Sequence, residues 1–137
     1  MPKTNQRPLV MVAIYLTGHQ LNPDSISQVL GTHLSRSQKK GGAKALTGKG
    51  IAEIGMWVLE VESESRSVSD LMDELFQKIG NPLLRLDELE GVENAILDVF
   101  VAQDEKAIGK DSVCFAMTQV QIVRLGQLGL SICATVM

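Results

Sequence analysis

The sequence predicts an α+β protein in which a mixed β-sheet of about five strands carries three helices, packed mainly on one face. Three observations support this prediction. The chain has 137 residues, which is the size of one domain. Apolar runs of strand length alternate with segments whose apolar residues recur at helical spacing. Capping residues, glycines and prolines separate these segments. Their order is β-α-β-α-β-β-α-β, which favours a single globular domain over residues 1–137.

The first strand and the first helix have the clearest signals. Residues 9–17 form an apolar run, which is typical of a central strand buried on both faces. Asn22 and Pro23 follow as a helix N-cap and a proline at the first helical position. Gly31 is a typical C-cap glycine, so a helix is predicted over residues 23–30. Its apolar stripe consists of Ile26, Val29 and Leu30.

A long basic loop is predicted over residues 32–55, because this segment has no regular hydrophobic period and contains five glycines. A loop of this length is uncommon in a compact domain and is usually functional or mobile. The strand predicted next, residues 56–61, alternates between two faces. Trp57, Leu59 and Val61 share one face, and Glu60 and Glu62 share the other.

Two capping patterns mark the later helices. Ser67 with Asp70 opens the second helix, and Thr118 with Gln121 opens the third. Gly129 ends the third helix. The apolar stripe of the second helix consists of Leu71, Met72, Leu75, Phe76 and Ile79.

The second helix is interrupted by a Gly-Asn-Pro break and is predicted to restart over residues 82–90. Leu83, Leu86 and Leu89 would then face inward. A polar hairpin loop is predicted over residues 103–111. The strands predicted in this half are 94–102 and 113–117, which flank that loop, and the final strand 130–136.

The uneven distribution of charge is the strongest compositional feature. The net charge is −3, yet no acidic residue occurs between Ser25 and Ala52. The remainder of the chain has 8 basic and 16 acidic residues, a net charge of −8. The basic residues of the acid-free segment are Arg36, Lys39, Lys40, Lys44 and Lys49.

No catalytic residue, metal site or cofactor is predicted. The segment Gly42–Gly50 differs from a phosphate-binding P-loop, because five residues instead of four separate its glycines and a glycine follows Lys49. General acid–base chemistry needs converging groups, whereas His19 and His33 each stand alone near the end of an element. No His, Cys or acidic residues have metal-ligand spacing. We expect a protein that is not an enzyme, with catalysis by either histidine as the minor alternative.

The basic loop permits three interpretations: a solvated loop, contact with an anionic ligand or nucleic acid, or recognition of a protein partner by paired charges. Nucleic acid is not favoured, because no aromatic residue in the loop can stack on a base. Trp57 is either a core anchor or part of an interface or pocket. Two acidic runs are either solvated or a docking surface for a basic partner. They are Glu60-Glu62-Glu64 and Asp87-Glu88-Glu90. The candidate binding residues are Arg36, Lys39, Lys40, Trp57, Glu60 and Glu62.

The sequence predicts a cytoplasmic protein that does not enter the membrane. No apolar run approaches the roughly 18 residues that a membrane-spanning helix needs. The run at residues 9–16 is too short, and its flanks do not fit a signal peptide. In a reducing compartment we expect Cys114 and Cys133, which lie in apolar segments, to be buried thiols.

Three blocks of the chain share their order and spacing with a known family. They are the apolar strand that ends at Gly18 followed by residues 22–26 and 29–31, residues 35–41 leading into 55–59, and residues 125–132. In these blocks the chain resembles the bacterial domain-of-unknown-function family numbered 4279. It departs from the family at Leu34-Ser35, where Pro-Thr is common. It also departs at its end, where an acidic residue and a tyrosine are common and this chain has Cys133, Ala134 and Val136.

The resemblance implies a small stand-alone bacterial protein without known activity, and some such domains look like immunity proteins encoded beside toxins. We therefore expect a binding protein whose acidic faces meet a basic toxin surface, with Arg36, Lys40 and Trp57 as secondary contacts or supports. The alternative is a domain that senses a small molecule or an anion through the basic loop and Trp57.

Overall fold

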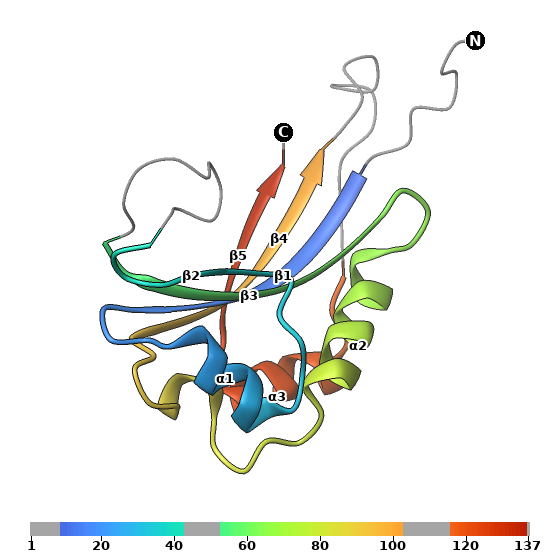
Figure 1. Cartoon of the computed structure of the whole chain (residues 1–137). Helices are drawn as coiled ribbons and strands as arrows, with labels where there is room; N and C mark the ends of the chain where they lie inside the picture. Colours follow the sequence, from blue (N-terminus) through green and yellow to red (C-terminus); the bar gives the residue numbers. More distant parts are fainter. Residues whose placement is uncertain (1–8, 43–52, 103–115, 137) are drawn as a thin grey trace, which may run out of the picture.

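The structure contains one five-stranded sheet and three helices (Figure 1). This computed structural model describes residues 9–42, 53–102 and 116–136. The strands are β1 (Leu9–Gly18), β2 (Arg36–Gln38), β3 (Gly55–Ser63), β4 (Asn94–Ala102) and β5 (Ser131–Val136). The helices are α1 (Pro23–Leu30), α2 (Val68–Ile79) and α3 (Gln119–Leu128), with a 3₁₀ turn, η1 (Leu86–Glu88), before β4.

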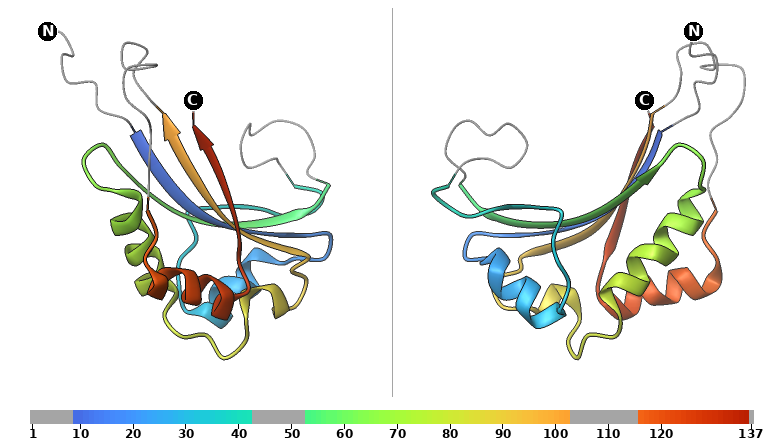
Figure 2. Two further views of the ribbon diagram at one scale, coloured as in Figure 1. Left: turned by 180° about the vertical axis from the view of Figure 1, so that it is seen from behind. Right: turned by 45° about the vertical axis from the view of Figure 1, so that its right-hand side comes forward.

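The sheet is mixed and has the strand order β2-β3-β1-β4-β5. β1 is the central strand and pairs antiparallel with both β3 and β4. β2 extends the sheet antiparallel to β3, and β5 extends it parallel to β4. All three helices lie on one face (Figure 2). The predicted α+β class, the mixed five-stranded sheet and the order of the helices and long strands are confirmed.

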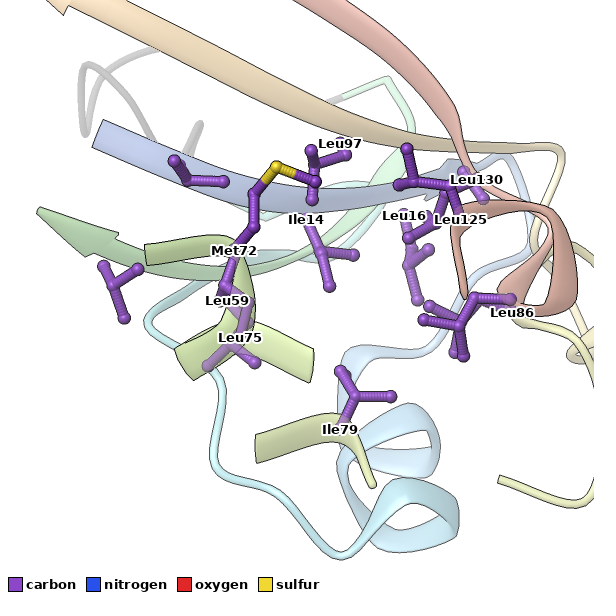
Figure 3. Close-up of a cluster of buried hydrophobic side chains, with 14 of the residues drawn as sticks. Ile14, Leu16, Leu59, Met72, Leu75, Ile79, Leu86, Leu97, Leu125 and Leu130 are labelled. Atoms are coloured by element: carbon purple, nitrogen blue, oxygen red, sulfur yellow. The ribbon is translucent and has the colours of Figure 1, made fainter. Parts of the chain in front are cut away.

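The hydrophobic core lies between the sheet and the helices. Ile14, in the middle of β1, is fully buried and pairs with Leu59 of β3 and Leu97 of β4. Directly paired residues point to the same face of a sheet, so each register step adds a row of aliphatic side chains to the core. The helix α2 packs against these rows (Figure 3) through its predicted stripe, of which Leu71, Met72, Leu75 and Ile79 are buried.

The helix ends follow the capping signals in the sequence. The side chain of Asn22 accepts a hydrogen bond from the backbone N–H of Asp24 at 3.0 Å, and Ser67 caps α2 in the same way. Thr118 and Gln121 form a reciprocal capping box at the start of α3. Each cap satisfies backbone N–H groups that have no partner inside the helix, so three short segments determine where the helices begin.

Two glycines are paired where β1 ends and β3 begins, a place that we call the glycine corner. Gly18 pairs with Gly55 across the two strands. A Cβ atom on Gly55 would overlap the carbonyl oxygen of Leu21, and one on Gly18 would overlap that of Gly91. Main-chain atoms of Leu21, before α1, and of Gly91, before β4, therefore lie so close to the strand ends that no side chain fits at Gly55 or Gly18.

The predicted helix over residues 82–90 is wrong. Only the 3₁₀ turn η1 forms there, and Leu83 is fully exposed. Leu86 and Leu89 are buried as expected. Their separation of three residues fits a 3₁₀ turn, in which the Leu89 N–H donates to the Leu86 carbonyl at 3.3 Å. Two apolar residues three positions apart fit a 3₁₀ turn and a turn of α-helix equally well, so their spacing in the sequence cannot distinguish the two.

Part of the predicted basic loop forms the edge strand β2. Its three residues pair with Met56, Trp57 and Val58 of β3. β2 has no alternating apolar pattern, because the side chains Arg36, Ser37 and Gln38 are all polar. Two of the five basic residues of the segment, Lys44 and Lys49, lie outside the described residues.

The last strand forms as predicted, but its burial does not follow the prediction. All six residues of β5 are exposed, and Cys133 is an exposed free thiol. The prediction of a buried Cys133 is wrong because β5 is an edge strand, whereas Cys114 lies outside the described residues. The strand predicted over residues 113–117 lies mostly outside them as well, and residues 116–117 have no regular structure.

The glycine corner gives a test of the fold. We expect Gly55→Ala to lower the free energy of unfolding by about 1–3 kcal/mol, because the new methyl group must displace main-chain atoms. The matched control is Gly126→Ala in α3, where no atom of the surrounding structure lies within 4 Å of the place that the methyl group would take. There alanine should raise stability by about 0.5–1 kcal/mol. Urea denaturation compares the two variants, and equal stabilities would contradict the close approach at Gly55.

Candidate functional site

The outer face of the sheet carries no helix in the described part of the chain and forms the candidate site (Figure 2). We call it the open face. Its side chains come from alternate positions of the three central strands, which the register brings side by side. They are Met11, Ala13 and Tyr15 of β1, Val58, Glu60 and Glu62 of β3, and Ile96, Asp98 and Phe100 of β4.

Carboxylates and apolar side chains share the rows of the open face. Ala13 lies between Glu60 and Asp98, and Met11 lies between Glu62 and Phe100. Glu62 is exposed and Asp98 is half-buried. Among the described residues neither of these two carboxylates has an ion-pair partner. Both acids are therefore available to a cation from outside the described chain.

Arg36 and Glu60, two of the predicted binding residues, bind each other. The Arg36 Nη2 atom lies 2.9 Å from a Glu60 carboxylate oxygen and donates to the Tyr15 hydroxyl at 3.0 Å. About a third or less of each charged side chain is exposed: 30% for Arg36 and 24% for Glu60. The pair neutralises its own charge and closes the β2 end of the open face.

The other described cations of the basic segment do not converge on a common point. Lys39 pairs with Asp24 of α1 at 2.8 Å, and both side chains are exposed. Lys40 is exposed beside it. Arg36 and Lys39 already bind carboxylates of this chain, so the described part of the basic segment shows no cluster of unpaired cations.

Trp57 lies on the opposite side of the sheet from Arg36. It is fully buried, and its indole N–H donates to the Ser27 hydroxyl at 2.9 Å. Trp57 therefore anchors β3 to α1, which matches the core interpretation. It cannot share a ligand surface with the open face, because neighbouring positions on a strand point to opposite faces.

His19, one of the two histidines considered for catalysis, binds a single carboxylate. The His19 backbone N–H donates to Glu93 at 2.9 Å, and its Nδ1 atom lies 3.2 Å from the same carboxylate. These hydrogen bonds, that of the backbone N–H first, lower the pKa of Glu93 below its ordinary range. The pair ties the turn after β1 to the segment before β4. His33 is exposed.

A groove between α2 and α3 was not predicted from the sequence. It has a volume of about 790 Å³ and lies between Phe76 of α2 and the exposed Val120 and Val123 of α3. At its floor the buried Gln121 side chain donates to Asp73 at 2.8 Å and to the Ser69 carbonyl at 3.0 Å, which links α3 to α2. Two valines on the outer side of a predicted helix are the only sequence signal for it.

Two kinds of site are not found in the part of the chain that the structure describes. No group of three His, Cys, Asp or Glu side chains there could hold a metal ion. None of the described helices is long and apolar enough to cross a membrane.

The Arg36–Glu60 pair gives a stability prediction. We expect Glu60→Gln to lower the free energy of unfolding by about 1 kcal/mol, because it leaves a half-buried guanidinium without a full counter-charge. Glu62→Gln, two residues along the same face, should change stability by less than about 0.5 kcal/mol. Thermal denaturation of both variants measures the difference. A Glu62 variant that is as destabilised as the Glu60 variant would show that the ion pair is not the cause.

The His19–Glu93 pair gives a pH prediction. Because the folded state lowers the pKa of Glu93, the pair stabilises the fold fully above the pKa of an unfolded glutamate, about 4.3. This contribution is lost as the pH falls through the lower, folded pKa. Carboxyl NMR titration should show Glu93 titrating below the ordinary glutamate pKa of about 4.3. His19→Ala should raise the Glu93 pKa only in part, because the backbone N–H remains, and an unshifted Glu93 would contradict the contact.

No family model matches the chain, and no curated protein or solved structure matches it. The resemblance to family 4279 stays a prediction from the three sequence blocks, and any functional conclusion rests on the geometry of this chain.

Proposed function

We propose that this protein is a binding protein that recognises a basic protein surface through the open face of its sheet. One observation carries the proposal. Alternate positions that would be polar on a solvated sheet face hold Met11, Tyr15, Ile96 and Phe100 here. Methionine and aromatic side chains are enriched at protein interfaces. The open face therefore has the composition of a contact surface.

The carboxylates determine which partner fits. Glu62 and Asp98 flank the apolar side chains and have no ion-pair partner among the described residues. A partner with lysine or arginine side chains would pair with them, and charge complementarity of this kind increases the association rate and the specificity. Arg36 would support the rim of the surface, Lys40 would make peripheral contacts, and Trp57 would hold β3 in place from the core side.

Within this class an immunity-type role is the specific form that we favour. The resemblance to family 4279 implies a stand-alone bacterial protein, and some domains of this kind look like inhibitors of toxins. A toxin that acts on nucleic acid or another anionic substrate needs a basic active surface, which an acidic open face would cover. The mechanism is occlusion and requires no catalytic residue.

The α2–α3 groove supports a second candidate function, the sensing of a small molecule. Its volume of about 790 Å³ is within the usual range for ligand pockets. The basic segment and Trp57 do not support this alternative, because Arg36 and Lys39 are paired and Trp57 is buried. A ligand in the groove should raise the melting temperature, and Val123→Trp, which fills the groove, should remove that increase.

Charge reversal on the open face tests the main proposal. Glu62→Lys combined with Asp98→Lys should weaken binding to the captured partner by about 100-fold or more, because like charges would then meet. Glu90→Lys, a charge reversal at the exposed Glu90 that follows η1, is the matched control and should bind normally. Affinity capture from the source cells, followed by titration with the purified partner, measures both variants.

Salt dependence provides a second measure of the same contact. Affinity for the wild-type protein should fall steeply between low ionic strength and about 0.5 M salt, because surface charges are screened there. Two results would rule out the open face as the acidic contact. One is an affinity that does not change with salt concentration, and the other is a Glu90→Lys variant that binds as poorly as the variant with both Glu62→Lys and Asp98→Lys.

A further inference from the structure

In the described part of the chain, the strand β5 is an unprotected edge of the sheet. Its six residues, Ser131–Val136, contain no charge and no proline. The opposite edge differs, because β2 has only three residues and includes the charged Arg36. Short edge strands and charged side chains are the usual means by which proteins prevent an edge from pairing with another chain. β2 has both protections and β5 has neither.

The surface around β5 is apolar on the helix side of the sheet. Ile132 and Val136 pair with the buried Leu97 and Val101 of β4 and therefore face the helix layer. Nevertheless Ile132 is 41% exposed and Val136 is 48% exposed. The described helix layer thus ends beneath β4 and leaves β5 uncovered.

The helix α3 adds an apolar side chain to the exposed surface on the helix side of β5, which we call the apolar flank. Successive helical residues are about 100° apart, so Val120 and Ile122 lie on opposite sides of the inward-facing Gln121. Val120 lines the groove towards α2, whereas Ile122 does not and is 53% exposed. Since α2 packs on β1 and β3, Ile122 lies on the side of α3 away from α2. Figure 2, left, looks onto this flank, where α3 leads into β5.

We propose that a second copy of this chain pairs with β5 in an antiparallel arrangement across a twofold axis, which gives one sheet continuous through both protomers. Each β5 would supply the backbone partners for the other. Any antiparallel alignment of two uncharged, identical strands avoids like-charge contacts, and a twofold interface requires such a self-complementary patch. A strongly charged foreign strand would find no counter-charge on β5.

The proposed interface needs the apolar flank as well as the strand edge. A stable interface buries roughly 800 Å² on each partner, which is more than one six-residue edge can supply. Ile122, Ile132 and Val136 from both copies would meet beneath the joined strands and contribute the remaining contact. Substitutions at the edge and on α3 should therefore both weaken the dimer.

The mass in solution tests the proposal. Analytical ultracentrifugation over about a hundredfold range of concentration should give the wild-type protein a mass near twice the chain mass of 14.9 kDa. Ala134→Lys, which adds a charge to the exposed edge, should give the monomer mass, and Ile122→Lys should shift the equilibrium in the same direction. Val29→Lys, at the 65% exposed Val29 of α1, is the matched control and should leave the dimer intact.

Several outcomes would overturn the proposal. These are a monomeric wild-type protein at every concentration, an Ala134 variant that stays dimeric, or a Val29 variant that dissociates. Circular dichroism confirms that each variant is folded.

Cross-linking of wild-type side chains does not depend on these variants. On the outer face of β5, the exposed Cys133 thiols of two paired strands would lie on the same side of the joined sheet. In a Cys114→Ser background, a short bis-maleimide should give a covalent dimer at low protein concentration, and additional Cys133→Ser should abolish it. A dimer by mass that does not cross-link through Cys133 would overturn the β5 pairing.

Discussion

The fold depends on the central position of β1, which is paired on both sides while only one of its faces is covered by helices. Its inward side chains Val12, Ile14 and Leu16 are fully buried, and each pairs with one residue of β3 and one of β4. The described helices cover one face of the sheet and exclude water from it. The opposite face is covered by no described helix, only by its own side chains. On that face Ala13 and Val58 are nevertheless buried, because the longer side chains around them cover the small ones. The open face is thus a direct consequence of the one-sided helix layer.

The same constraint explains the exposed edge. α2 packs on β1 and β3, and α1 packs on β3, so the described helix layer is centred on that half of the sheet. α3 ends at Gly129 and turns directly into β5. Because β5 follows α3 directly, it lies at the margin of the described helix layer. Apolar residues in β5 are therefore compatible with stability, although nothing in the described chain buries them.

The sequence allowed the prediction of those parts of the fold that have a local cause. The caps Asn22, Ser67 and Thr118 and the stripe of α2 depend on hydrogen bonds and spacing within a few residues, so they were correct. β2 was not predicted, because it is held by main-chain pairing with β3 and its side chains are polar. Cys133 was misplaced because burial in β5 depends on strand order, and strand order is not a local property.

The candidate site shows the same division. Glu60 and Glu62 were correctly assigned to one face of their strand, because alternation is local. Their neighbour Asp98 was not foreseen as a member of the open face, since it is brought there only by the pairing of β1 with β4. Arg36 and Trp57 were considered together, yet the pleat of β2 and β3 places them on opposite faces. The face of its own strand on which a residue lies could be predicted from the sequence. Which residues of different strands lie next to each other depends on the sheet topology.

The two proposed surfaces are compatible and affect each other. Antiparallel pairing of two β5 strands would keep the outer faces of both sheets on the same side, because a continuous sheet has two faces only. A dimer would then present two open faces, each with its Glu62 and Asp98, next to one another. Two such sites on one particle would bind a partner with two basic patches more tightly than either site alone, through a raised effective concentration. The edge strand would thereby determine the number of binding sites, and the open face would determine what they bind.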